Sequence, residues 1–169
     1  MKYFAFGSNM LTERLRARCP SANSIGKGFA EGYRVRFSKR GDDGSGKATL
    51  VRASGHNAFG VLFTIAAPDV AALDKAEGSG YLRDDLFEIT QIPLGHELTV
   101  GTYHARPTAM DDGLQPYDWY QNLVVAGAQQ HALPGDYINM LASVSAQPDP
   151  DPRRHGRVEI DRILGRGSD

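Results

Sequence analysis

Apolar and polar residues alternate with a period of two through much of the first half of the chain, which predicts β-strands. Lys2–Gly7 alternates aromatic and small residues, Tyr33–Lys39 alternates regularly, and Thr49–Arg52 has the pattern of a short strand. Ala58–Ile65 is more continuously apolar, which is typical of a more deeply buried strand. Strands are therefore expected to dominate the first half.

Helical spacing of apolar residues interrupts and follows these strands. It predicts a helix over Met10–Cys19 that Pro20 stops. A second, short helix is expected after Pro68, because proline is tolerated in a first helical turn, and Gly78 is placed to end it. Glu77 then lies at the C-terminal end of that helix.

The residue pattern in the second half of the chain predicts two strands followed by two helices. Leu82–Pro93 and Glu97–Ala105 have the pattern of strands linked around Gly95, and Tyr117–His131 and Gly135–Val144 that of helices. Short strands with few helices between them favour an α+β fold, with a small mixed β-barrel or curled sheet flanked by a few helices.

We expect one domain over residues 1–169, in which 147–169 is a partly extended C-terminal segment. The run QPDPDP at 147–152 cannot form helix or sheet ladders. It is either an ordered crossing or a linker to a last short element, Val158–Leu164. No internal repeat is visible.

Composition narrows the classes of protein. The 169 residues are 41% hydrophobic and 23% charged, with a formal net charge of −1, as in an ordinary soluble globular domain. This balance provides no global field to attract nucleic acid or an anionic membrane. The single cysteine, Cys19, excludes an internal disulfide framework, and no signal-like apolar run follows Met1, so a cytoplasmic location is expected.

Three candidate motifs fail on chemistry. GDDGSGKA at 41–48 resembles part of a phosphate-binding loop, but Ala48 replaces the magnesium-binding hydroxyl and two aspartates would repel phosphate, which favours a hairpin turn. Ser79 lacks the Gly-x-Ser-x-Gly setting of a nucleophilic serine. The five histidines show no helical i,i+4 pair and no partner cysteines, so no metal site is expected.

The turn Gly7-Ser8-Asn9 follows a strand and precedes a helix. Such a turn can present several backbone N–H groups in one concave surface, which suits a carboxylate or a developing oxyanion. The alternative is a plain capping turn in which Ser8 or Asn9 is the N-cap. Glu77 has a similar alternative, because a glutamate near a helix end is normally exposed to solvent.

Several blocks of the sequence together resemble the γ-glutamylcyclotransferase family. The stretch from Tyr3 to Arg14, which contains Phe6-Gly7-Ser8-Asn9, is similar to the family's N-terminal signature, whose usual form is Tyr-Gly-Ser-Asn-Leu. Further matching blocks follow in the family's order: Phe59–Phe63, Leu73-Asp74, Glu77-Gly78, Tyr81, Tyr120, Gly127-Ala128, Leu133-Pro134 and Tyr137.

The resemblance implies a reaction without a cofactor. The α-amine of a γ-glutamyl amino acid or peptide attacks its own γ-carbonyl, which gives 5-oxoproline and a free amine. Glu77 matches the family's general acid/base, and its place at the negative end of a helix, beside apolar strand residues, is expected to raise its pKa. The small-molecule γ-glutamyl substrate is the partner that the resemblance implies, and a homodimer is an open option.

The resemblance also implies where the substrate binds. The residues expected to line the glutamyl site are Tyr3, Phe4, Ala5, Phe6, Gly7, Ser8 and Asn9, with a hydroxyl from Tyr120. Tyr81 and Arg83 are expected as neighbours of the site. Phe6 stands where the family usually has tyrosine, and the strand pattern leaves it either packed in the core or at the edge of the pocket.

Two alternatives remain beside this reaction. The chain could remove a γ-glutamyl group from another small amine by the same chemistry, since only the pocket outside the glutamyl site would differ. It could also be a non-catalytic small-molecule binding protein of the same fold, although a binding protein has no need for a base at Glu77.

Overall fold

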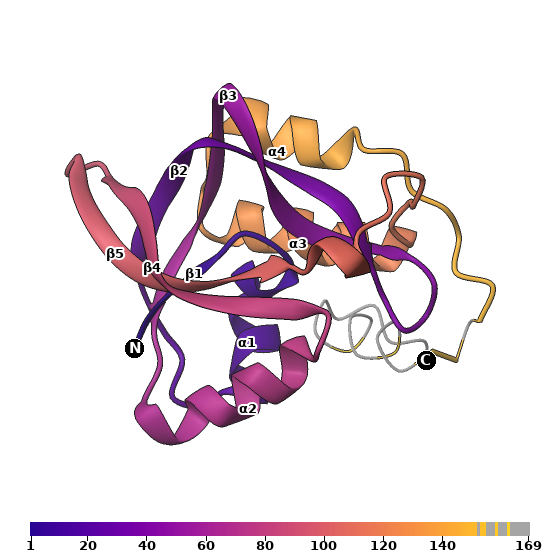
Figure 1. Cartoon of the computed structure of the whole chain (residues 1–169), viewed down its shortest axis with the longest axis horizontal. Helices are drawn as coiled ribbons and strands as arrows, with labels where there is room; N and C mark the ends of the chain where they lie inside the picture. The colour runs from indigo at the N-terminus through magenta and orange to yellow at the C-terminus, as the bar shows by residue number, and fades with distance from the viewer. Residues whose placement is uncertain (152, 155–157, 159–161, 163–169) are drawn as a thin grey trace.

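A computed structural model describes residues 1–151, 153–154, 158 and 162 of the chain (Figure 1). Its strands are β1 (Lys2–Ala5), β2 (Asn23–Arg40), β3 (Gly46–Thr64), β4 (Tyr81–Ile92) and β5 (His96–Ala105). They form a closed barrel in the order β1-β3-β2-β4-β5. The neighbouring strands are antiparallel except β1 and β5, whose parallel pairing of Tyr3 with Gly101 closes the barrel.

Helices flank the barrel on two sides (Figure 1). The 3-10 turn η1 (Ser8–Met10) leads from β1 into α1 (Thr12–Arg18), which packs against α2 (Ala67–Glu77). A short turn η2 (Pro107–Ala109) follows β5. The helices α3 (Asp118–Gln130) and α4 (Gly135–Ala142) pack against each other, and α3 also packs against η1. The expected α+β barrel with a few helices is confirmed.

The core joins the barrel interior to the inner faces of α1 and α3. Phe4 is fully buried, and its ring lies 6.2 Å from that of Phe87, between ring centroids, in a stacked arrangement. Leu15 from α1 and Leu123 from α3 are also fully buried. Because β1 is buried on both faces and runs directly into η1, the residues after it are held rigidly against the helices.

The two longest strands, β2 and β3, are longer than the sequence pattern predicted. The chain is continuously extended over β2 and β3, where the pattern predicted only Tyr33–Lys39, Thr49–Arg52 and Ala58–Ile65. Gly32, with φ at +73°, forms an irregularity that shifts the register between Glu31 and Tyr33. Such a glycine breaks the alternation of side chains without ending the strand, so the periodicity is lost where the ladder continues.

The other predicted elements lie within a few residues of their observed ends. The first helix is shorter than expected, because Met10 belongs to η1 and α1 begins at Thr12. The turn after Arg40 joins β2 to β3, which confirms the hairpin interpretation of GDDGSGKA. The last predicted element, Val158–Leu164, lies largely outside the described residues.

The start of the C-terminal segment is an ordered crossing rather than a free linker. Gln147 pairs with Tyr117, and the backbone N–H of Asp118 donates to the carbonyl of Gln147 at 3.0 Å. The carboxylate of Asp149 is buried, where it accepts hydrogen bonds from the indole of Trp119 at 2.8 Å and from Arg154 at 2.6 Å. This part of the segment is therefore fixed to the start of α3.

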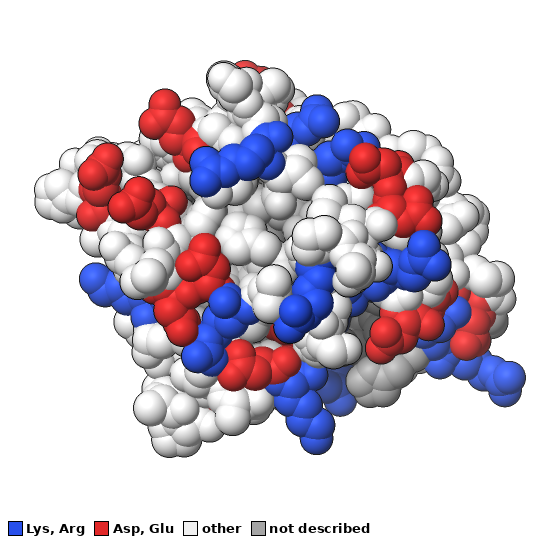
Figure 2. Space-filling model, viewed as in Figure 1, with Lys and Arg blue, Asp and Glu red and all other residues white. Residues whose placement is uncertain are grey.

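Charged side chains are mixed on the surface. On the face shown in Figure 2, Lys and Arg are interspersed with Asp and Glu, so no large patch of a single sign forms there. Among the described residues, no helix has the length and apolar character needed to span a membrane. No group of three His, Cys, Asp or Glu side chains in the described part of the chain has the arrangement of a metal site.

Candidate active site

The helix α2 places Glu77 at its last position. Pro68 lies in the first turn, and Gly78, with φ at +75°, ends the helix in a conformation that glycine adopts without strain. Both features were predicted from the sequence. The chain then turns directly into β4 at Tyr81, so the carboxylate of Glu77 and the ring of Tyr81 come from the two sides of one tight connection.

Asn9 connects Glu77 to the N-terminal strand. Its side-chain amide donates to Glu77 Oε1 at 2.6 Å and to the hydroxyl of Tyr3 at 3.1 Å. The amide oxygen of Asn9 accepts a hydrogen bond from Arg18 at 2.8 Å, and Arg18 also lies 3.9 Å from Glu77 Oε1. The side chain of Asn9 is thus fixed at three points and orients the carboxylate of Glu77.

The environment of Glu77 shifts its acidity in two opposing directions. Burial raises the pKa of the Glu77 carboxyl, since only 14% of its side chain is exposed. The charge of Arg18 and the hydrogen bond from Asn9 favour the ionised form and oppose this effect, so the net pKa is raised but the carboxylate keeps stabilising partners. A raised pKa is the property that a carboxylate needs to exchange protons near neutral pH.

A narrow pocket of about 30 Å³ opens beside this carboxylate. It is lined by Tyr3, Phe6, Gly7, Ser8, Asn9, Ala48, Glu77, Tyr81, Tyr103 and Tyr120. The structure therefore brings together Glu77, the turn Gly7–Asn9 and the predicted site residues Tyr81 and Tyr120, which are distant from that turn in the sequence. Arg83, which was expected nearby, does not line it: its guanidinium pairs with Asp74 at 2.7 Å on the surface.

Two of the predicted lining residues lie beneath the pocket instead. Phe4 and Ala5 are fully buried and do not line it, because the ring of Phe4 points into the barrel core and Ala5 carries only a methyl group. Phe6 was expected either to pack in the core or to lie at the edge of the pocket, and the structure shows both. It is 6% exposed, its ring lies 6.5 Å from that of Phe4, and it contributes to the pocket wall.

The turn at Gly7 leaves donors beside the pocket. The first hydrogen bond of η1 joins the N–H of Met10 to the carbonyl of Gly7, so the N–H groups of Ser8 and Asn9 precede the hydrogen-bonded part of the turn. A Cβ atom at Gly7 would lie 3.1 Å from the side chain of Ala48 and 3.7 Å from the hydroxyl of Tyr120. Glycine therefore keeps this wall of the pocket open.

Ala48, near the start of β3, holds two of the four pocket tyrosines, Tyr81 and Tyr120, through its backbone. Its N–H donates to the hydroxyl of Tyr120 at 3.1 Å, and its carbonyl accepts a hydrogen bond from the hydroxyl of Tyr81 at 2.7 Å. Burial raises the pKa of both phenols, so both remain protonated at neutral pH. The segment that resembles a phosphate-binding loop is thus a wall of the candidate active site.

Sequence reasoning missed Tyr103 and Ala48. The hydroxyl of Tyr103 donates to Asp74 at 2.7 Å, and its ring meets that of Tyr3 edge to face with centroids 5.9 Å apart. Asp74 belongs to the Leu-Asp block of the family resemblance, and in the structure it accepts this hydrogen bond from a tyrosine of the pocket. Neither missed residue has a local signal, because barrel closure brings them to the site.

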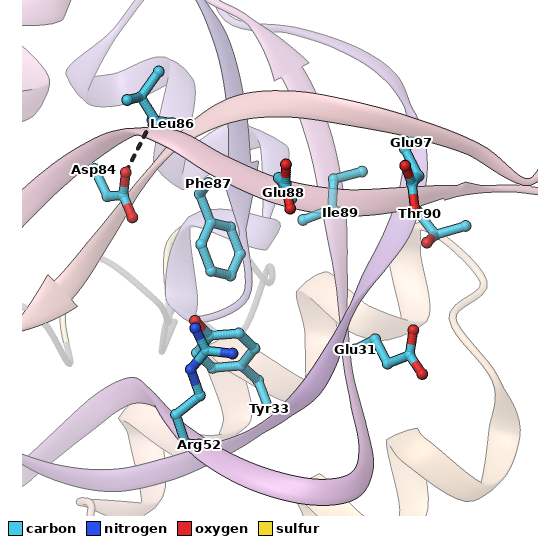
Figure 3. A pocket seen from close by; sticks show the side chains of 10 residues that line it. All are labelled: Glu31, Tyr33, Arg52, Asp84, Leu86, Phe87, Glu88, Ile89, Thr90 and Glu97. Carbon is cyan, nitrogen blue, oxygen red and sulfur yellow. Dashed lines mark hydrogen bonds between the residues drawn. The ribbon is translucent and has the colours of Figure 1, made fainter.

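A second cleft of about 420 Å³ lies between β2, β3, β4 and β5 (Figure 3). The rings of Tyr33 and Phe87 face it, with centroids 5.2 Å apart, and the guanidinium of Arg52 lies over the ring of Tyr33 at 4.3 Å. This cleft contains none of the predicted site residues. The predicted residues that line a cavity are therefore found around Glu77 and not in this cleft.

Comparisons with known proteins identify the family of the chain. The sequence pattern of the AIG2-like family matches residues 57–141. The chain is 30% identical to the γ-glutamylcyclotransferase of Bos taurus over 175 aligned residues, which cover 98% of this chain and 88% of that protein. Its identity to the γ-glutamylcyclotransferase of Homo sapiens is 25%, with the same coverage.

The fold agrees as well. A solved structure titled γ-glutamyl cyclotransferase superimposes with a TM-score of 0.86 at 25% identity, covering 98% of each chain. The closed barrel with its flanking helices is thus a cyclotransferase-like α+β fold. The chain belongs to the γ-glutamylcyclotransferase and AIG2-like family.

Proposed function

We propose that this protein is a γ-glutamylcyclotransferase in which Glu77 is the general acid/base. The observation that carries the proposal is the buried carboxylate of Glu77, which Asn9 orients at 2.6 Å toward a pocket lined by the turn Gly7–Asn9. A base at this place is expected in an enzyme that must deprotonate an ammonium group. A protein that only binds its ligand has no use for one.

The reaction moves two protons from the attacking nitrogen to the leaving amine. The α-amine of the γ-glutamyl group is mostly protonated at neutral pH, and Glu77 accepts its proton to produce the nucleophile. The amine nitrogen then attacks the γ-carbonyl carbon, and a new C–N bond closes the five-membered ring and leaves the ring nitrogen positively charged. When the original C–N bond breaks, Glu77 returns the first proton to the leaving amine. Glu77 then accepts the second proton from the ring nitrogen and passes it to the departing amine, so that a neutral lactam and an ammonium form and Glu77 is ionised again.

Ring closure is intramolecular, so positioning contributes much of the rate. Holding amine and carbonyl in contact can lower the barrier by up to ~7–11 kcal/mol. The N–H groups of Ser8 and Asn9 are the donors that we assign to the substrate's α-carboxylate or to the developing oxyanion. A single oxyanion donor typically contributes ~3–4 kcal/mol. Tyr81 and Tyr120 complete the wall of the glutamyl site, and no cofactor takes part in these steps.

The test is release of 5-oxoproline by the purified protein. A panel of γ-glutamyl amino acids, glutathione and γ-glutamyl alkylamines covers the amino-acid, peptide and amine leaving groups. We expect turnover of at least one compound, and less than about a tenth of that turnover by the Glu77→Gln variant. If the wild-type protein released no 5-oxoproline from any member of the panel, the proposed reaction would be wrong and a binding role would take its place.

A further inference from the structure

The single tryptophan of the chain, Trp119, lies beside the candidate active site. It lines a cavity of about 180 Å³ that adjoins the pocket at Glu77, and the two share Ser8, Glu77, Tyr81 and Tyr120. Trp119 does not line the pocket at Glu77 itself. It directly precedes Tyr120 in the first turn of α3, so any effect of Trp119 on the pocket passes through its neighbours.

The ring of Tyr120 packs against two other aromatic rings. Trp119 meets it edge to face at an interplanar angle of 90°, with centroids 5.9 Å apart. Phe37 meets it at 89°, with centroids 6.1 Å apart. The ammonium group of Lys47 lies 4.6 Å from the centroid of the Tyr120 ring and 4.9 Å from that of Trp119. The place of the Tyr120 ring therefore depends on where the indole lies.

The indole is fixed in turn by a carboxylate from the C-terminal segment. Nε1 of Trp119 donates to Oδ2 of Asp149 at 2.8 Å, and the side chain of Asp149 is fully buried. An indole has only this one donor, so its hydrogen bond sets the orientation of the ring. The contact joins α3 to a residue 30 positions further along the chain.

The carboxylate of Asp149 is itself held at both oxygens. Arg154 donates to Oδ2 at 2.6 Å, and the backbone N–H of Asp151 donates to Oδ1 at 2.9 Å. Burial opposes ionisation, but the hydrogen bonds from Arg154, Asp151 and Trp119 lower the pKa of the Asp149 carboxyl. Asp149 is thus an ionised acceptor for the indole at neutral pH.

We propose that Asp149 is a positioning residue of the active site. Through the indole of Trp119 it holds the ring of Tyr120, so that the Tyr120 hydroxyl stays at the hydrogen bond from Ala48 and in the wall of the pocket at Glu77. This inference rests on the proposed function, because it assigns the Tyr120 hydroxyl to the substrate site. Asp149 lines neither cavity and acts only through Trp119.

Two substitutions of Asp149 separate the hydrogen bond from the charge. Asp149→Ala is expected to lower kcat/KM for 5-oxoproline release from the best substrate of the panel, by up to about 100-fold, the loss that a misplacement of about 1 Å can cause. Asp149→Asn is expected to retain most of kcat/KM, because its amide oxygen can accept the hydrogen bond from the indole. Asp151→Ala, at an exposed position of the same segment, is the matched control. Wild-type kcat/KM in Asp149→Ala overturns the inference.

A double-mutant cycle tests whether Asp149 acts through the Tyr120 hydroxyl. Tyr120→Phe removes the hydroxyl and is expected to lower kcat/KM. Asp149→Ala is then expected to cause no further loss in the Tyr120→Phe background, because two changes that act through one group are not additive. An unchanged kcat/KM in Tyr120→Phe, or losses that multiply in the double variant, would show that Asp149 supports only the fold.

The fluorescence of Trp119 reports the contact directly, since the chain has a single tryptophan. Asp149→Ala is expected to increase the quenching of this fluorescence by acrylamide, and Asp149→Asn and Asp151→Ala to leave it unchanged. Melting temperatures report whether each variant is folded. If Asp149→Ala does not fold, Trp119→Phe takes its place, because it removes the N–H donor and leaves Asp149 paired with Arg154. The same loss of kcat/KM, again absent in the Tyr120→Phe background, is expected.

Binding separates this inference from the proposed reaction. Calorimetry on Glu77→Gln measures the affinity for each member of the panel without turnover. If the wild-type protein turns over no compound, but one binds and Asp149→Ala weakens its binding only when Tyr120 is present, the reaction is wrong and the role of Asp149 stands. If a compound is turned over and Asp149→Ala keeps the wild-type kcat/KM, the reaction stands and the role of Asp149 is wrong. If no compound is turned over or bound, both are wrong.

Discussion

The side-chain amide of Asn9 donates a 2.6 Å hydrogen bond to Oε1 of Glu77, which joins the N-terminal turn to the end of α2. The contact spans 68 positions of the sequence and involves Oε1, one of the two carboxylate oxygens of Glu77. It separates two functions of the turn: the side chain of Asn9 orients the base, and the backbone N–H groups are the donors assigned to the substrate.

Replacing Glu77 by glutamine is expected to remove most turnover while the fold and substrate binding remain. The amide oxygen of glutamine can still accept the hydrogen bond from Asn9, but the group cannot carry a proton. The measurement is kcat for 5-oxoproline release, with the melting temperature as the control for folding. Retention of more than about a tenth of the wild-type kcat would remove Glu77 from this role.

The pH profile of kcat/KM is expected to have its acid limb above the ordinary pKa of glutamate, about 4.3. Burial raises the pKa of Glu77, and the base acts only when ionised, so activity falls as pH decreases through this raised value. Asn9→Ala and Arg18→Met are each expected to move the limb to higher pH, because each removes a group that favours the carboxylate. A limb that moves to lower pH in either variant would contradict the assignment.

The glutamyl half is expected to be recognised stringently. A β-aspartyl dipeptide is one methylene shorter, so its amine and carbonyl cannot both reach Glu77 and the donors of the turn Gly7–Asn9. Paired donors discriminate strongly against a ligand that leaves them unpaired. Cyclisation of a β-aspartyl dipeptide would close a strained four-membered ring, so the measurement is binding: calorimetry on Glu77→Gln compares the affinities for a γ-glutamyl and a β-aspartyl dipeptide. Similar affinities for the two compounds would show that the turn does not hold the glutamyl group.

Phe6→Tyr is expected to destabilise the protein by ~1–3 kcal/mol without improving catalysis, because the ring is packed and the added hydroxyl lacks a partner. Phe4→Tyr is the comparison, since Phe4 is buried but does not line the pocket. Thermal unfolding and kcat/KM on a γ-glutamyl dipeptide are the measurements. An unchanged melting temperature with a several-fold gain in kcat/KM would show that the ring edge reaches the substrate.

The sequence predicts much of the fold, because most helix and strand ends carry local signals such as Pro68 and Gly78. It fails where glycines interrupt alternation inside a continuous strand, as at Gly32 in β2. The site divides in the same way. Glu77 and the turn Gly7–Asn9 were expected at the site because of the family resemblance, whereas Tyr103 and Ala48 reach the pocket through strand pairings that no short stretch encodes.

The two hydrogen bonds of Ala48 make the length of the preceding turn a determinant of the active site. Both tyrosine hydroxyls are held by the main chain of Ala48, so an insertion or deletion within residues 41–45 would shift both hydroxyls at once. A change of side chain at position 48 would leave these contacts in place. Surface hairpins usually accept changes in length. The length of this hairpin, in contrast, sets the positions of two tyrosine hydroxyls in the candidate active site.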